Sequence, residues 1–256
     1  FKPPPNSNQR YDEEYNGTTP LFIAANKGHL SIVEFLLNNK ADPTLMNAHG
    51  QTVLHTAVLT NHTSLLTLLL QHKVSPNMQN RNGETPLLLA VREKNSPFAK
   101  MLLDHGADPH NNVAQNMKTC LQEALDNGDM PMVKLLHDYG LDLNQTSSWC
   151  STRYTSRMHT TPLVYATCSY EMRFFSDTTQ YVECLLQLGA DPNKRTDDGD
   201  TPLCQACLNA SDAIVTTLLK HGADPSLPHT SPKGGSITPL QIAMMYAIHR
   251  KPTSLK

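Results

Sequence analysis

One motif, Thr-Pro-Leu followed by small residues, returns at a fixed spacing along most of the chain. The segment "NGTTPLFIAANKGHLSIVEFLLNNKADP" (16–43) recurs at 49–76 and 82–109, and Gly17, Gly50 and Gly83 are therefore spaced 33 residues apart. Further copies follow at 117–144, 160–193 and 198–225, and a last copy supplies only its first part. Self-similarity at this period predicts a stack of small units that share one core.

Each copy has the features of two helices joined by a turn. In Thr-Pro-Leu the threonine hydroxyl can cap a helix start, and proline fits the first helical position without losing a hydrogen bond. Alanines follow, and a Val-x-x-Leu-Leu pattern then predicts a longer second helix. Just past that helix we expect a left-handed residue, where a side chain costs about 1 kcal/mol relative to glycine. The residues at this position are Lys40, Lys73, Gly106, Gly140, Gly189 and Gly222.

One such unit cannot bury its own apolar face, but six or seven stacked units bury a continuous core. The repeat resembles the ankyrin-repeat family in its period and in the signature T-P-L-H-x-A. The best matches are "GTTPLFIAANKGHLSIVEFLL" (17–37) and "TVLHTAV" (52–58), with His55 at the histidine position. The resemblance departs at the fourth copy, where Met117 replaces the hairpin glycine and Cys120 the proline. It implies an all-α fold, an ankyrin-repeat solenoid of helix-turn-helix units with β-hairpin fingers.

The resemblance covers residues 14–250 and sets the expected organisation of the chain. We expect an extended or disordered arm over 1–13 and a tail over 251–256. Repeats are predicted near 14–46, 47–79, 80–113, 114–146, 158–195 and 196–228, with a partial repeat over 235–250. Insertions into this pattern are expected to form loops, because the stacking faces cannot accept them. The insertions are 147–159, 169–179 and 228–237.

The insertion 147–159 contains Trp149, the only tryptophan in the sequence. The run has no obvious helical or strand period. The resemblance implies that fingers project at the edge of a concave groove, which would place Trp149, Arg153, Tyr154 and Arg157 where a partner binds. Tryptophan, tyrosine and arginine are enriched in interface hot spots. Alternatively, Trp149 folds back and fills the irregular junction between repeats, or the run is disordered. In 169–179, the favoured role of Phe174 and Phe175 is to cap the helical layer.

Composition excludes several classes of partner. Lys plus Arg total 21 against 23 Asp plus Glu, a formal net charge of −2. Binding to a phosphate backbone needs clustered cations, so we expect no nucleic-acid partner. No apolar run approaches the roughly 20 residues that span a bilayer, so no membrane insertion is expected. The six cysteines lack framework spacing and predict reduced thiols in a cytoplasmic or nuclear protein.

Motifs for catalysis and metal binding are weak. The sequence holds no phosphate loop, Gly-x-Ser-x-Gly elbow or His-Glu-x-x-His motif. Cys204 and Cys207 have Cys-x-x-Cys spacing, but zinc needs four ligands and no second pair has comparable spacing, so we interpret them as buried thiols. The acidic run 197–200 lacks the remaining ligands of a calcium loop and resembles a family hairpin tip; it could also form an acidic patch for a basic partner. We expect no catalytic residue, no metal and no cofactor.

Other polar residues follow the repeat. Histidines are predicted at the turn between helices or near the helix cap, at His29, His62, His72, His105 and His221. The resemblance also implies that the hairpin asparagines are candidates for hydroxylation, at Asn77, Asn144 and Asn193.

The predicted function is that of a scaffold, not of an enzyme. We expect a monomer with a rigid concave groove and finger loops that binds another protein or a peptide, because a rigid groove loses little entropy on binding. The alternative is a regulatory or substrate-recruiting module of a larger enzyme, such as a ubiquitin ligase, kinase or methyltransferase, since the chain starts without Met and its last repeat is half finished. Predicted contacts are Tyr15, Asn26, Lys27, His49, Gln51, Arg81, Asn82, Glu84, Arg92, Glu93, Lys118, Asp197, Asp198 and Asp200, besides the four insertion residues above.

Overall fold

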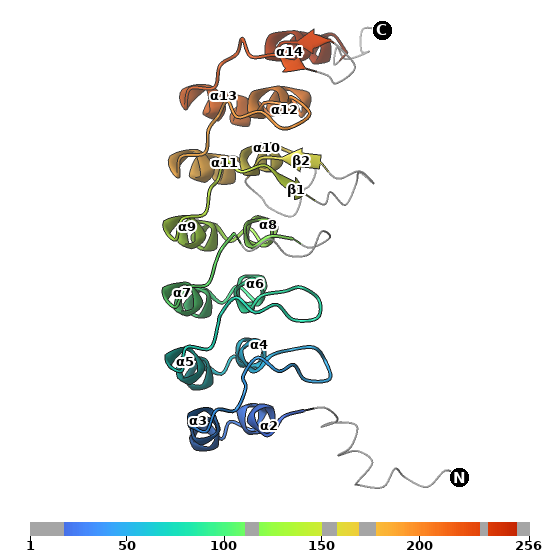
Figure 1. Ribbon diagram of the computed structural model, residues 1–256. Coiled ribbons are helices and arrows are strands. Elements are labelled where there is room, and N and C mark those ends of the chain that lie inside the picture. The colour runs from blue at the N-terminus through green and yellow to red at the C-terminus, as the bar shows by residue number, and fades with distance from the viewer. Residues whose placement is uncertain (1–17, 111–117, 150–157, 169–177, 231–234, 250–256) are drawn as a thin grey trace, which may run out of the picture. The chain divides into compact units, whose positions relative to one another are not determined.

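The computed structural model describes residues 18–110, 118–149, 158–168, 178–230 and 235–249 of the 256-residue chain. Contacts between residues divide the chain into two compact units, Phe1–Glu123 and Ala124–Lys256. In both units the predicted pairs of short helices are present (Figure 1). The first unit contains α2 (Pro20–Asn26), α3 (Leu30–Asn38), α4 (Val53–Leu59), α5 (Thr63–Gln71), α6 (Pro86–Arg92), α7 (Ser96–Asp104) and the start of α8 (Cys120–Asp126).

The second unit begins within α8 and contains six further helices and two small hairpins among its described residues. The helices are α9 (Met130–Asp138), α10 (Pro162–Thr167), α11 (Thr178–Gln187), α12 (Pro202–Leu208), α13 (Asp212–Lys220) and α14 (Pro239–His249), the first of them paired with α8. The hairpins are β1 (Ser147–Trp149) with β2 (Met158–Thr160), and β3 (His229–Thr230) with β4 (Ser236–Ile237). The last repeat thus supplies a first helix, as predicted.

The helix signals read from the sequence are confirmed. Thr85 Oγ1 accepts a hydrogen bond from the Leu88 N–H at 3.2 Å, and proline follows the threonine at the first helical position. The same cap starts four more first helices, at Thr19, Thr161, Thr201 and Thr238, and Thr119 caps α8 without a following proline. Lys40 and Lys73 have φ of 65° and 57°, and the four predicted glycines also have positive φ. The five histidines lie at the ends of second helices, as N-caps or C-caps.

The core of the first unit lies between two rows of helices. The first helices α2, α4 and α6 contact one another in order, and so do the second helices α3, α5 and α7. Because α4 is covered on both sides, six of its seven residues are buried, whereas α3 in the first repeat buries only Val33 and leaves Phe35 66% exposed. Leucines fill the interior, among them Leu54, Leu65, Leu66, Leu69, Leu87, Leu88 and Leu102.

The second unit repeats this arrangement. Helix α12 contacts α10 and α14, and α11 contacts α13. Cys204 and Cys207 pack with Ile242 of α14 in the apolar interior, which confirms the interpretation of these cysteines as buried thiols. Burial also raises the pKa of Cys207, so its thiol stays protonated. No helix in the described ranges is both long and apolar enough to cross a lipid bilayer.

Two of the insertions lengthen fingers into hairpins. In the first, Ser147 pairs with Thr160 and Trp149 with Met158, although the run shows no strand period in its sequence. In the third, His229 pairs with Ile237. The described part of the chain excludes Arg153, Tyr154, Arg157 and the side chain of Trp149. Whether this insertion binds a partner or fills the junction between repeats therefore stays a prediction. Of the second insertion, residues 178 and 179 belong to α11, and Phe174 and Phe175 lie outside the described part.

Candidate functional site

The fingers that precede α4 and α6 are closed by an asparagine. Asn80 Oδ1 accepts hydrogen bonds from the N–H groups of Asn82 and Glu84, both at 2.9 Å, and the Asn80 N–H donates to the Glu84 carbonyl at 2.9 Å. Asn47 makes the corresponding bonds with Gln51 one repeat earlier. A side chain that bonds its own backbone in this way fixes a tight turn. Each finger is therefore a rigid support for the side chains at its tip.

Successive fingers also hold each other. The Arg81 N–H donates to the Gly50 carbonyl at 3.0 Å, and Arg81 Nη1 donates to the Ala48 carbonyl at 3.0 Å. The aliphatic part of Arg81 lies directly over Gly50, where an added Cβ would come within 2.3–2.5 Å of its Cβ, Cγ and Cδ atoms. Gly50 is thus required both by its φ of 75° and by this contact.

Gly50→Ala should therefore destabilise the first unit more than a left-handed alanine alone does. Gly106→Ala is the matched control, because Gly106 has φ of 86° but nothing within 4 Å of the added Cβ. We expect a loss of about 1 kcal/mol for Gly106→Ala and about 2 kcal/mol for Gly50→Ala, where the clash is added. Urea denaturation followed by circular dichroism measures both. Equal losses would mean that the Arg81 contact contributes nothing.

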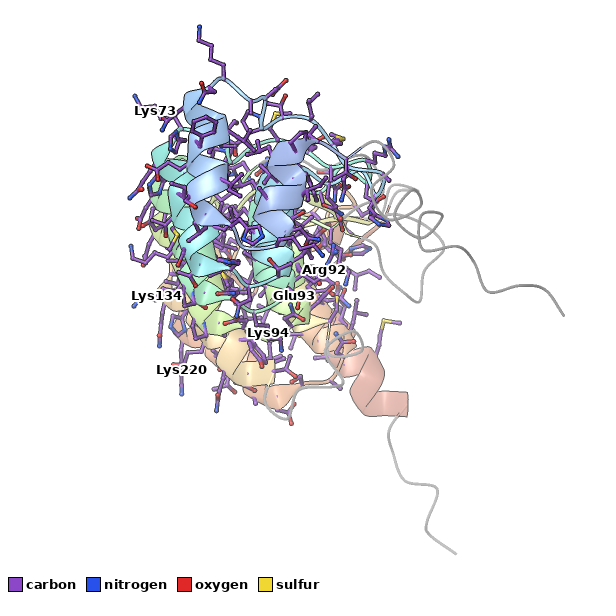
Figure 2. All side chains as sticks on the ribbon, turned by 90° about the horizontal axis from the view of Figure 1, so that it is seen from below. Lys73, Arg92, Glu93, Lys94, Lys134 and Lys220 are labelled. Carbon is purple, nitrogen blue, oxygen red and sulfur yellow. The ribbon has the colours of Figure 1, made fainter. Side chains whose placement is uncertain are left out.

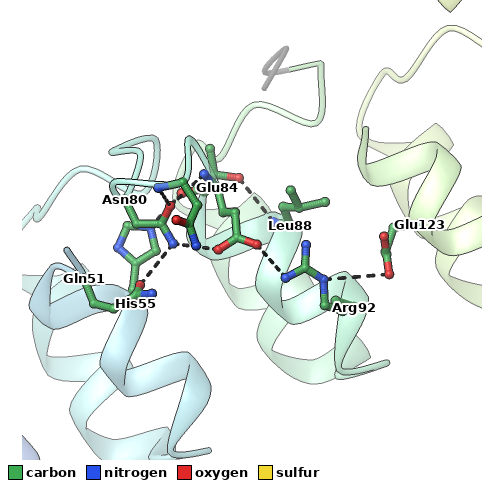
Figure 3. Close-up of polar contacts among 9 residues, drawn as sticks. Gln51, His55, Asn80, Glu84, Leu88, Arg92 and Glu123 are labelled. Atoms are coloured by element: carbon green, nitrogen blue, oxygen red, sulfur yellow. Dashed lines mark hydrogen bonds and ion pairs between the residues drawn. The ribbon is translucent and has the colours of Figure 1, made fainter. Parts of the chain in front are cut away.

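A polar network links the fingers to the helices (Figure 3). Asn80 Nδ2 donates to Gln51 Oε1 at 3.2 Å and to Glu84 Oε2 at 2.7 Å. Arg92 Nη1 pairs with Glu84 Oε1 at 2.5 Å, and Arg92 Nε lies 3.8 Å from Glu123 Oε1. The chain of contacts therefore runs from the finger before α4, through the next finger and α6, to α8.

Glu84 is the centre of this network. The residue is 6% exposed. Burial raises the pKa of its carboxyl group, but hydrogen bonds from Asn80 and Arg92 and the positive charge of Arg92 outweigh burial and leave that pKa lowered. Glu84 therefore stays ionised at neutral pH and stabilises the fold through its contacts with Asn80 and Arg92. This burial means that a charge reversal at Glu84 would disturb the finger itself, so Glu84 is unsuitable as a surface probe of binding.

His55 belongs to α4 and links this helix to the finger 80–84. Its ring is fully buried, Nε2 donates to the Glu84 carbonyl at 2.9 Å, and Nδ1 accepts from the Thr52 N–H at 3.3 Å. A carbonyl can only accept, so the proton sits on Nε2 and the imidazole is neutral. Burial lowers the pKa of His55, against the opposing influence of Glu84. The neutral ring is therefore the form that the fold requires.

The first helices carry a second set of polar links, between the seventh residue of one and the fourth of the next. Arg92 ends α6 and reaches Glu123 in α8. In the second unit, Asp126 ends α8 and accepts a hydrogen bond from the Tyr165 hydroxyl of α10. Between the first two repeats these positions hold Asn26 of α2 and Thr56 of α4, and no hydrogen bond joins their two side chains.

A pocket of about 440 Å³ lies between the first two repeats, between α2 and α4 and beneath the finger 47–51. Its lining includes the apolar side chains of Ile23 and Leu59 and the polar groups of Asn26, His49, Gln51 and Thr56. We call the surface formed by the fingers 47–51 and 80–84 together with Asn26, Leu59 and Arg92 the finger face. It is mixed in charge, and Figure 2 shows Arg92, Glu93 and Lys94 together where α6 ends.

The structure thus brings several predicted contact residues together. Asn26, His49 and Gln51 meet at the pocket, while Gln51, Glu84 and Arg92 share the network. Tyr15 lies outside the described residues. Sequence reasoning missed Asn80, Glu123 and Leu59; the spacing of 33 between Asn47 and Asn80 is the signal that could have revealed the finger asparagines. Exposed predicted residues are Asn26, Lys27, His49, Arg81, Asn82, Glu93, Lys118, Asp197 and Asp198, and partly buried ones are Gln51, Arg92 and Asp200.

In the second unit, the acidic run forms a finger tip, as the resemblance implied. The Thr196 hydroxyl accepts from the Asp200 N–H at 3.0 Å, and Gly199 has φ of 83°. Asp200 Oδ1 lies 2.5 Å from His229 Nδ1, and burial raises the pKa of Asp200 although His229 opposes this. Asp197 and Asp198 are exposed. Asp200 therefore joins its finger to β3, and no group of three or more metal-ligating side chains occurs in the part of the chain that the structure describes.

The three hairpin asparagines each link two repeats. Asn77 Nδ2 donates to the Gly106 carbonyl at 2.9 Å, and its Oδ1 accepts from the Asp108 N–H at 2.8 Å. Asn144 and Asn193 make the equivalent pair of bonds to the loops after Gly189 and Gly222. Their carboxamides are thus used within the fold; their hydroxylation stays a prediction.

Comparison with known proteins identifies the fold and the family. A family model for ankyrin repeats in three copies matches residues 4–80, 21–113, 60–147, 151–229 and 173–251. The crystal structure of the ankyrin repeat domain of Bcl-3, a member of the IkappaB protein family, is 29% identical with a TM-score of 0.70, over 89% of this chain and 94% of that one. An ankyrin repeat domain from Acinetobacter baumannii AYE is 26% identical with a TM-score of 0.65, over 80% and 98%.

The human ASB11 ankyrin repeat domain shares the fold at 21% identity, with a TM-score of 0.60 over 92% of this chain and 100% of that one. No curated protein sequence matches the chain significantly. Ankyrin repeat domains generally mediate protein–protein interactions, and those compared are typically modules without catalytic activity. The matched ranges cover most of the sequence, and the helix pairs, finger turns and cap residues agree with them: the chain belongs to the ankyrin-repeat family.

Proposed function

We propose that this chain binds a partner protein on the finger face, with the finger tips providing specific polar contacts. The observation that carries the proposal is the construction of the finger 80–84. Arg81 and Asn82 are exposed at its tip, while Asn80 and Glu84 beneath them are buried and fully engaged in hydrogen bonds. Exposed polar groups on a fixed backbone lose little entropy when they bind.

The mixed charge of the face favours recognition by shape and by individual contacts. Arg81 and Arg92 lie among Glu84, Glu93 and Glu123, so no single sign of charge dominates. A partner with complementary polar groups is therefore selected more by geometry than by long-range attraction. Asp197 and Asp198 offer a separate acidic contact on the second unit.

The test is the affinity of a purified partner for two charge-reversal variants. Arg81→Glu reverses the charge at the finger tip and also removes the hydrogen bond to the Ala48 carbonyl, so melting curves must show that this variant stays folded. Lys220→Glu makes the same charge change at the end of α13, in the second unit. After a partner is isolated from cell extract, calorimetry with both purified proteins should show about tenfold weaker binding for Arg81→Glu, or about 1.4 kcal/mol. Lys220→Glu should bind as the wild type does. Equal affinities for Arg81→Glu and wild type would refute the proposal.

We further expect a monomer that works in the cytoplasm or the nucleus, where the buried thiols Cys204 and Cys207 stay reduced. Light scattering of the purified chain tests the oligomeric state. The alternative role, as a regulatory or recruiting module of a larger enzyme, stays a prediction from the sequence.

A further inference from the structure

The pocket between α2 and α4 differs chemically from the rest of the finger face. Of the described residues that line it, none carries a carboxylate, an ammonium or a guanidinium group. Its apolar part comes from Phe22 and Ile23 of α2 and from Leu59, which ends α4 and is 48% exposed. A charged group placed here would lose water without gaining a partner of opposite charge. The pocket therefore suits an uncharged, aliphatic group.

The position of the pocket follows from the side chains at the linking positions of the first helices. Arg92 of α6 is long enough to reach Glu123 of the next first helix, α8. Where α2 meets α4, the corresponding Asn26 and Thr56 are short, and the space between the two helices stays open. The volume of about 440 Å³ lies in the lower part of the range of about 300–1,000 Å³ that binding pockets occupy.

The rim of the pocket offers carboxamides. Gln51 Oε1 accepts from Asn80, whereas its Nε2 makes no hydrogen bond to another described residue. The carboxamide of Asn26 is exposed and likewise has no hydrogen bond within the described part of the chain. A carboxamide presents one acceptor and two donors, which match the N–H and C=O of a peptide group. This combination of an aliphatic base and amide rim is suited to an extended main chain with an apolar side chain.

We propose that this pocket receives an extended, uncharged segment of a partner protein through one or two aliphatic side chains. Asn26 and Gln51 hydrogen-bond the main chain of that segment, and Ile23 and Leu59 contact the aliphatic side chain. Because the same finger 47–51 covers the pocket and supports Arg81, the segment continues from the pocket onto the finger tips. The inference rests on the proposed function and names the chemistry of the partner segment.

Random twelve-residue peptides displayed on phage provide the probe, selected against the full chain. The enriched peptides should share Leu, Ile, Val or Met at one fixed position, without charged residues beside it. Binding of a synthetic enriched peptide, measured by fluorescence anisotropy, should weaken at least tenfold with Leu59→Gln and several-fold with Asn26→Ala. Replacing the shared aliphatic residue of the peptide with Asp should abolish binding.

Leu219→Gln is the matched control, since Leu219 lies near the end of α13 and is 45% exposed, close to the 48% of Leu59. This variant should bind the peptide as the wild type does, and melting curves should show that all variants fold. An empty peptide pool, a pool without a fixed aliphatic position, or unchanged affinity of Leu59→Gln overturns the inference. If Arg81→Glu still weakens partner binding in that case, the proposed function survives; if Arg81→Glu also binds normally, both fall.

Discussion

Glu84→Gln is expected to lower the free energy of unfolding of the first unit by about 2 kcal/mol. The carboxylate accepts from Asn80 and pairs with Arg92, whereas the amide nitrogen of glutamine would face one of these donors with another donor. Breaking a fully buried ion pair costs about 3–5 kcal/mol, and the value here is smaller because the Arg92 side chain is 37% exposed. The midpoint of urea denaturation at neutral pH measures the loss.

The effect should shrink in acid. The fold lowers the pKa of Glu84, so the carboxylate stabilises the folded state above its unfolded pKa, and this contribution disappears as the pH falls through the folded pKa. Glu93→Gln is the matched control, because Glu93 follows Arg92 in the chain but is exposed and should change stability by less than about 0.5 kcal/mol. A loss for Glu84→Gln as small as that of Glu93→Gln would contradict the role given to the network.

The features that could be predicted from sequence are those that a residue imposes on its own backbone. Thr85 caps α6 and Pro86 starts it through local geometry alone, and Lys73 is left-handed because it occupies the position of Gly106 one repeat earlier. Such signals recur in most copies, so the helix pairs follow from the period. The ankyrin-repeat fold was therefore predictable.

The burial of Glu84 was not predictable in the same way. The position after the finger glycine holds Gln51 in the preceding copy and Asp200 in a later one, and each is a polar residue of the kind that ordinarily faces water. Its burial depends on Asn80 in the same finger, on Arg92 eight residues later and on Gln51, which is 29 residues from Asn80. These contacts exist only after the repeats have stacked.

The pocket and the first hairpin were missed for related reasons. Leu59 occupies the same helix position as Asn26 and Arg92, and an apolar residue at a helix end is assigned to the core by its type, although the short side chains around it leave it half exposed. The pairing of 147–149 with 158–160 comes from backbone hydrogen bonds between the two arms of a finger. That pairing needs no alternation of apolar and polar side chains, so the sequence carried no strand period.

His55 should show the largest effect of any polar side chain in the first unit. In His55→Leu the buried Thr52 N–H loses its partner and the Glu84 carbonyl keeps only the Asn80 N–H, so we expect a loss of about 3 kcal/mol in unfolding free energy. His55→Gln should cost only about 1 kcal/mol, because glutamine at this position can still accept from the capping threonine. Gln122 does so in the fourth repeat, where its Oε1 accepts from the Thr119 N–H at 2.8 Å.

The same two variants separate the hydrogen bonds of His55 from its titration. Burial lowers the pKa of His55 below the unfolded value of about 6.5, so the unfolded chain binds more protons and stability falls as the pH drops from about 6.5 toward the folded pKa. Urea denaturation between pH 7.5 and pH 5 should therefore show a decline in wild type that is reduced in both variants. His29→Gln, which removes an exposed histidine without a side-chain cap bond, should retain the decline. If the stability of His55→Gln declines as steeply as that of the wild type, the acid sensitivity comes from another group and not from protonation of the buried His55 ring.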